Sequence, residues 1–211
     1  MNTSVKSSAA PRPPANEDGL LGAALQGAAR VSRWLARIGG AMMLVCAILV
    51  TLDVVVRAAF KVTYFESFEL STYAFAIATA LGLSYALVSR AHIRIEVLYM
   101  LLPARRRGWV DLFAYVVLAV CALTLLYWSA QLVLGNYQSG ARSNSSLSLP
   151  LVIPQGIWLV GLAWFALLSV LYALLGLRLC LRGRPEQAHR QLGVASLEEE
   201  IEANVTRKSS P

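Results

Sequence analysis

Two charged residues lie inside the first long apolar segment of this 211-residue chain, as Asp53 and Arg57 in DVVVR. Their spacing of four residues places both side chains on one face of a helix, with the acid on the N-terminal side, which is the order that favours an ion pair. Intramembrane charges are costly and are candidates for coupling to an ion or a substrate. A structural ion pair or a contact with a partner is the alternative, because Arg57 lies near the segment's end and its head group can reach the interface.

A second pair, His92 and Glu96, is also spaced i, i+4 and would share a helix face, as two metal ligands do. Zinc usually needs three or four ligands, and the other histidine, His189, lies far away in the C-terminal region. The sequence has no HExxH motif, no paired nucleophile and base, and no glycine-rich phosphate loop. We therefore predict no catalytic site, no metal and no cofactor.

The composition identifies the elements that must position these residues. Hydrophobic residues make up 57% of the chain and charged residues only 15%, which is too apolar for a soluble domain of this length. A bilayer core needs about 20 apolar residues in helical conformation. The sequence predicts an all-α integral membrane protein with four transmembrane helices, at Ile38–Phe60, Leu70–Val88, Val110–Leu134 and Leu151–Leu177.

The basic residues predict the orientation, because cytoplasmic loops retain Lys and Arg. Three groups of arginines flank the segments, and the two remaining loops contain only Lys61 and Arg142; the groups are Arg30, Arg33 and Arg37, then Arg90, Arg94 and Arg105–Arg107, then Arg178, Arg182 and Arg184. Both termini and the central loop are therefore predicted to be cytoplasmic. The net charge of +7 lies at the segment edges, where it suits lipid headgroups and not nucleic acid.

The chain divides into a tail over residues 1–29, a four-span membrane domain over residues 30–182 and a tail over residues 183–211. The first residues are polar and proline-rich, without the apolar core of a cleaved signal peptide. We expect this tail to be largely disordered until about Leu20, where an amphipathic helix begins that leads into the first span.

The second span carries small residues at every fourth position, namely Ala74, Ala78, Gly82 and Ala86. Such a stripe lets helix backbones approach closely in lipid. It predicts packing against the other spans of this chain or against a larger membrane partner. Just before the stripe, Glu66 and Glu69 are favourable at the positive end of the helix dipole or contact a partner.

The loop after the second span alternates polar and apolar residues over His92–Val97, as a strand does. A lone strand at a membrane surface would leave its backbone groups unpaired. We predict instead an interfacial amphipathic helix from about His92 to Leu102, with His92 and Glu96 on one side, ended by Pro103 and held at the surface by the following arginines.

Taken together, four spans, the DVVVR and FESFEL segments and above all AHIRIEVLYMLLPARRR resemble the small membrane subunit of tripartite ATP-independent periplasmic (TRAP) transporters, the DctQ-like family. The resemblance covers about residues 30–182, and the matching residues are Arg57, Glu69, His92, Ile93, Arg94, Leu102 and Pro103. Ala91 stands where the family often has glycine, Glu96 where aspartate is commoner, and Ser67-Phe68 separates glutamates that are often adjacent.

The resemblance implies a non-catalytic scaffold subunit in the bacterial inner membrane. Its implied partners are a large multi-span subunit, which carries the substrate and ion sites, and a periplasmic binding protein that delivers a small organic acid; membrane lipid is a further expected partner. Candidate contact residues are Asp53, Arg57, Glu69, Ala74, Ala78, Gly82, His92, Arg94 and Glu96. The alternative is a self-sufficient homo-oligomeric transporter that uses Asp53 as its coupling acid. The other alternative is a membrane-embedded enzyme, for which the sequence shows no set of residues that could form an active site.

Overall fold

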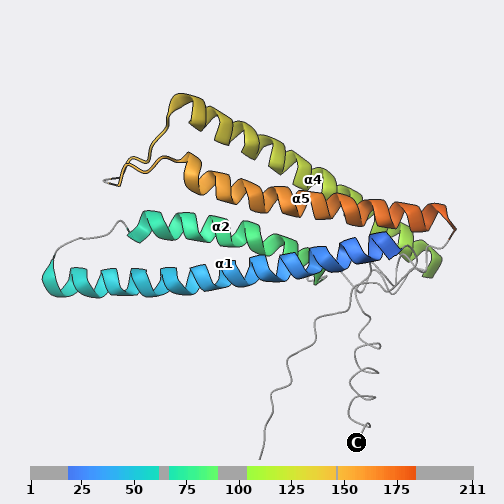
Figure 1. Ribbon diagram of the computed structural model, residues 1–211, viewed down its shortest axis with the longest axis horizontal. Coiled ribbons are helices and arrows are strands. Elements are labelled where there is room, and N and C mark those ends of the chain that lie inside the picture. The colour runs from blue at the N-terminus through green and yellow to red at the C-terminus, as the bar shows by residue number, and fades with distance from the viewer. Residues whose placement is uncertain (1–18, 62–66, 90–103, 146, 184–211) are drawn as a thin grey trace, which may run out of the picture. The chain divides into compact units, whose positions relative to one another are not determined.

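The computed structural model describes residues 19–61, 67–89, 104–145 and 147–183, with the backbone alone over residues 19–24 and 104–106. In this part of the chain lie four long helices, α1 (Gly19–Phe60), α2 (Ser67–Val88), α4 (Ala104–Ser139) and α5 (Val152–Leu181) (Figure 1). Each is long and apolar enough to cross a membrane. The predicted all-α fold with four transmembrane helices is confirmed. Glu66, the predicted interfacial helix and most of both predicted tails lie outside the described residues.

Three of the four helices extend well beyond the predicted spans. The first predicted span occupies only the second half of α1, which has 42 residues and continues without a break through the predicted lead-in segment. At ~1.5 Å per residue, such a helix is about 63 Å long, twice the thickness of a bilayer core of about 30 Å. The helix α1 is therefore too long to lie within the hydrocarbon region, and its N-terminal part extends beyond it.

The connection between α4 and α5 spans residues 140–151 and is a polar turn whose described part is held by backbone hydrogen bonds. Gly140 ends α4 with φ = 61°, a left-handed conformation that glycine adopts without strain, and the amide of Ala141 donates to the carbonyl of Asn136 (3.0 Å). An isolated antiparallel bridge then joins Arg142 to Pro150. The side-chain amide of Asn136 also donates to Gln155 Oε1 (2.8 Å), which links the C-terminal end of α4 to the start of α5.

The described residues form two compact units, one within residues 1–91 and 120–168 and the other within residues 92–119 and 169–211. In the first unit, α1 and α2 lie side by side as an antiparallel hairpin (Figure 1). In the second unit, the beginning of α4 packs on the end of α5, where the rings of Tyr115 and Tyr172 stack with centroids 5.6 Å apart. The thiol of Cys180 also lies 3.7 Å from the carbonyl oxygen of Gly108.

The buried side of α1 is a seam with a seven-residue repeat, consisting of Leu25, Ser32, Gly39, Cys46 and Asp53, joined by Ala28 and Ala29; all of these except Leu25 are small or polar. A seven-residue repeat keeps one line of a helix against its neighbours over many turns. The seam contacts α5, because Trp164 Nε1 donates to Ser32 Oγ (3.1 Å). The large aliphatic residues of α1, such as Leu44 and Ile48, are exposed instead. Thus α1 packs through its small residues and presents its large ones outward.

Candidate partner-contact site

Asp53 is the most deeply buried charged residue of α1, with 3% of its surface exposed. Its Oδ2 atom accepts hydrogen bonds from Arg57 Nη2 and from Ser67 Oγ, both at 2.6 Å. The Arg57 side chain is half exposed while the carboxylate is covered. The structure thus brings the predicted pair Asp53 and Arg57 into contact and adds Ser67 from the first turn of α2, so that the charge of Asp53 is compensated on both sides.

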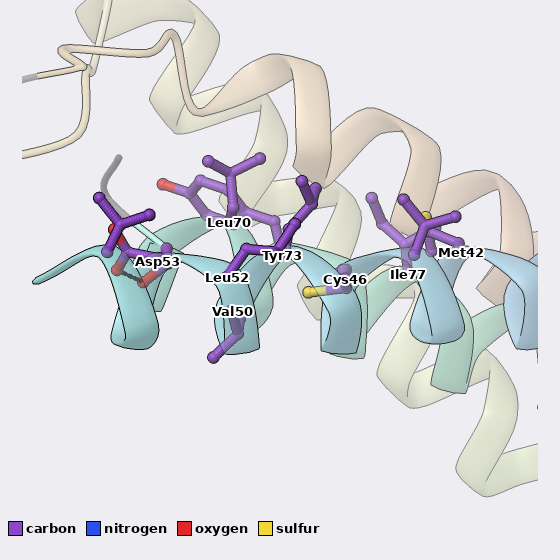
Figure 2. Close-up of a pocket in the computed structure, with 13 residues that line it drawn as sticks. Met42, Cys46, Val50, Leu52, Asp53, Leu70, Tyr73 and Ile77 are labelled. Carbon is purple, nitrogen blue, oxygen red and sulfur yellow. Dashed lines mark hydrogen bonds between the residues drawn. The ribbon is translucent and has the colours of Figure 1, made fainter. Parts of the chain in front are cut away.

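An apolar groove of about 670 Å³ runs between α1 and α2 from this polar cluster toward Met42 and Ile77. Figure 2 shows the Asp53 carboxylate at one end of the groove and Met42 and Ile77 at the other. Aliphatic side chains, Tyr73 and the sulfur atoms of Met42 and Cys46 make up most of its wall. Because so few polar atoms face it, the groove suits an apolar side chain or an acyl chain and provides no coordination shell for an ion.

The predicted small-residue stripe of α2 lies along the half-buried flanks of that helix. Ala74 lines the groove, and Ala78 approaches α1 so closely that a Cβ placed on Gly39 would lie 3.2 Å from its carbonyl oxygen. A Cβ on Gly82, in contrast, would meet nothing within 4 Å. Two of the stripe's positions therefore face α1, whereas Gly82 makes no close approach within the described chain.

The closest backbone approach of α2 occurs at a position outside the predicted stripe. Ala80 is 1% exposed, and a Cβ built on Gly161 of α5 would lie 3.0 Å from the Ala80 Cβ and 3.2 Å from the amide nitrogen of Leu81. Gly161 therefore allows α5 to touch the α2 backbone. The sequence contained no distinct signal for this contact, since Gly161 is one of several small residues in the fourth span.

Glu69 joins the start of α2 to the turn between α4 and α5. Its Oε1 accepts a hydrogen bond from the hydroxyl of Tyr73 (2.6 Å). The hydroxyls of Ser143 and Ser145 lie beside the carboxylate, yet Oε2 is buried and accepts no hydrogen bond from the described residues. Glu69 was predicted to lie at the positive end of the α2 helix dipole. In the structure it also connects α2 to the loop that follows α4.

The second unit contains a buried acid that the sequence analysis did not identify. Asp111 of α4 has no exposed surface, and neither does Ser169 of α5. Asp111 lies near the Cys180 thiol, which places a carboxylate inside the contact between α4 and α5. The signal in the sequence was an acidic residue within the third predicted span, since charged residues in a span usually make buried polar contacts.

The remaining predicted site residues, His92, Arg94 and Glu96, lie outside the described residues. Over the described ranges, no group of three His, Cys, Asp or Glu side chains is arranged to hold a metal ion. The site that the structure does describe, formed by Asp53, Arg57, Ser67 and the adjoining groove, consists of contacts between helices. It has the character of a packing surface within a membrane.

Comparison with known proteins gives the family. No curated protein and no solved structure matches this chain significantly. The sequence profile of the family described as "Tripartite ATP-independent periplasmic transporters, DctQ component" matches residues 46–179. The match covers more than half of the chain and includes all of α2 and α4 and parts of α1 and α5. This chain therefore belongs to the DctQ component family of tripartite ATP-independent periplasmic transporters.

Proposed function

We propose that this chain is the small scaffold subunit of a TRAP-type secondary transporter in the bacterial inner membrane. It works with a large multi-span membrane subunit, which moves a small organic acid with the energy of an ion gradient, and with a periplasmic protein that binds the acid. The observation that carries this proposal is the DctQ family match over residues 46–179. That family is a component of a transporter, which supports a role in transport.

The outward side of α1 and the groove beside α2 support a role in assembly. Leu44, Ile48 and Leu52 are each more than half exposed, which leaves a long apolar surface for lipid or for another membrane protein. Small residues at Gly39, Ala78 and Ala80 mark the closest contacts between helices. A closely packed helical hairpin with a large apolar exterior suits a scaffold that steadies a neighbouring transport domain.

The state of Asp53 argues against a self-sufficient transporter. A coupling acid must exchange a proton or an ion during transport, whereas Asp53 is held by both Arg57 and Ser67 at 2.6 Å. Removing either donor would leave a buried charge less compensated. We therefore assign Asp53 to the joining of α1 and α2.

We further propose that both termini and the loop between α2 and α4 are cytoplasmic. The α1–α2 and α4–α5 connections would then face the periplasm, where the binding protein operates. The basis is the excess of arginine beside the predicted cytoplasmic ends.

Affinity purification of the tagged chain from its native membrane, followed by mass identification, tests the proposed function. We expect a large polytopic protein in near equimolar amount. Recovery of this chain alone after mild extraction, as a defined homo-oligomer that transports substrate and loses transport with Asp53→Asn, would contradict the scaffold role. Matched purification of an unrelated inner-membrane protein controls for proteins that are retained nonspecifically.

A further inference from the structure

Three arginines and a tryptophan lie on one side of α1 just before its main apolar stretch, and we call Arg30, Arg33, Trp34 and Arg37 the arginine face. At 3.6 residues per turn, the three arginines fall within an arc of about 60°. They point away from the buried seam, since Ser32 and Gly39 are buried whereas Arg30 and Arg37 are exposed and Arg33 is half-buried.

Among the described residues, no acid compensates the charge of the arginine face. Within the part of α1 that the structure describes with side chains, the acid is Asp53, which pairs with Arg57, and no ion pair joins a described carboxylate to Arg30, Arg33 or Arg37. Trp34 is 59% exposed, and the guanidinium carbon of Arg37 lies 5.7 Å from its ring centroid. This cation–π contact holds the guanidinium near the helix surface and leaves its N–H groups available to an external acceptor.

An apolar strip continues directly from the arginine face along the same side of α1. Ala41, Leu44 and Ile48 follow Arg37 at i+4, i+7 and i+11, and all three are exposed. The surface therefore changes from three positive charges and an indole ring to purely aliphatic side chains within about one helical turn. A phospholipid has the same order, with a phosphate, an interfacial glycerol region and an acyl chain.

We propose that the arginine face is a binding site for an anionic phospholipid, with the phosphate on Arg30, Arg33 and Arg37 and an acyl chain along Ala41, Leu44 and Ile48. The net negative charge of the headgroup supplies the preference over a zwitterionic lipid, because each arginine adds electrostatic attraction at the membrane surface. Trp34 lies at the boundary between headgroups and hydrocarbon, where tryptophan is enriched. The site rests on membrane insertion and is independent of which protein subunit binds the chain.

Native mass spectrometry of the purified full chain in a neutral detergent tests the site. The probes are phosphatidylglycerol and phosphatidylcholine with identical acyl chains, added in equal amounts. We expect the wild type to retain phosphatidylglycerol preferentially. Each of Arg30→Gln, Arg33→Gln and Arg37→Gln should lower that retention about fivefold, the effect of one basic residue at an anionic surface.

Two matched variants separate the proposed contact from general effects. Arg37→Lys keeps the charge and should stay within about twofold of the wild type, whereas Lys61→Gln removes an exposed positive charge at the other end of α1 and should change nothing. Circular dichroism verifies that each variant keeps its helical content.

Equal retention of both lipids by the wild type, or equal losses from Lys61→Gln and Arg37→Gln, would overturn the proposal. So would arginine variants that retain lipid normally but release the co-purifying large subunit, because that outcome assigns the face to a protein. Co-purification of the large subunit tests the proposed function separately, so a failure of the lipid site can be distinguished from a failure of the proposed function.

Discussion

Asp53 and Ser67, fourteen residues apart, are joined by a 2.6 Å hydrogen bond between Oδ2 and Oγ that connects the C-terminal half of α1 to the first residue of α2. This bond fixes how the hairpin closes, because its two ends belong to different helices and one of them is a buried carboxylate.

Ser67→Ala should destabilise the α1–α2 hairpin modestly, by ~0.6 kcal/mol, the mean for a polar contact between helices in a membrane. The loss is limited because Arg57 still compensates the carboxylate. Unfolding by denaturant in mixed micelles measures the effect. Ser71→Ala is the control, since Ser71 Oγ donates only within its own helix, to the carbonyl of Phe68. Equal destabilisation by both variants would contradict the proposed role of Ser67.

Gly161→Ala should destabilise the contact between α5 and α2 by about 1–3 kcal/mol, the usual cost of overpacking. The added Cβ would lie 3.0 Å from the Cβ of Ala80 and 3.1 Å from its backbone carbonyl carbon, which cannot move independently of α2.

The control for that prediction is Gly156→Ala, five residues earlier on the same helix, where a Cβ would meet nothing within 4 Å. This change should be neutral or stabilising by up to about 1 kcal/mol, because alanine is the better helix former. Thermal unfolding of both variants in the same detergent gives the comparison. A Gly161→Ala protein as stable as Gly156→Ala would show that α5 and α2 are not in close contact.

Tyr73→Phe should loosen the turn between α4 and α5. The change removes the hydroxyl that donates to Glu69 Oε1 and leaves a partly buried carboxylate with fewer donors, at a cost of about 1–3 kcal/mol. Hydrogen exchange over residues 141–151 should become faster, since Ser143 and Ser145 lie beside the same carboxylate. Tyr137→Phe, at an exposed position near the end of α4, is the matched control. Unchanged hydrogen exchange in the Tyr73→Phe variant would contradict the proposed contact between Glu69 and the α4–α5 turn.

Cysteine labelling in intact cells should establish the orientation. In a background with Cys121→Ala, which removes the exposed native cysteine, Asn144→Cys in the α4–α5 turn should react with a membrane-impermeant maleimide. Gln26→Cys, at an exposed position in the first part of α1, should react only after the cells are permeabilised. The opposite pattern would invert the proposed topology.

Much of this architecture could be predicted because lipid restricts the backbone so strongly. A span must be an apolar helix, so hydropathy predicted the four helices, and local spacing predicted the contact of Asp53 with Arg57. Contacts between helices were harder, because Ser67 meets Asp53 only through the geometry of the hairpin. The deepest small-residue contact, Ala80 with Gly161, depends on how α2 is rotated about its axis, which the stripe at Ala74 and Ala78 did not determine.

The arrangement of residues on α1 has a consequence for biogenesis. The side chains that make this helix hydrophobic enough to enter the bilayer are its exposed ones, such as Leu44 and Ile48, whereas the seam that packs it is small or polar. Membrane insertion of α1 and its packing against neighbouring helices therefore depend on different residues of this helix. We infer that α1 enters the membrane as an independent helix and folds against α2 and α5 afterwards, so that a defect in the seam leaves a protein correctly inserted but unassembled.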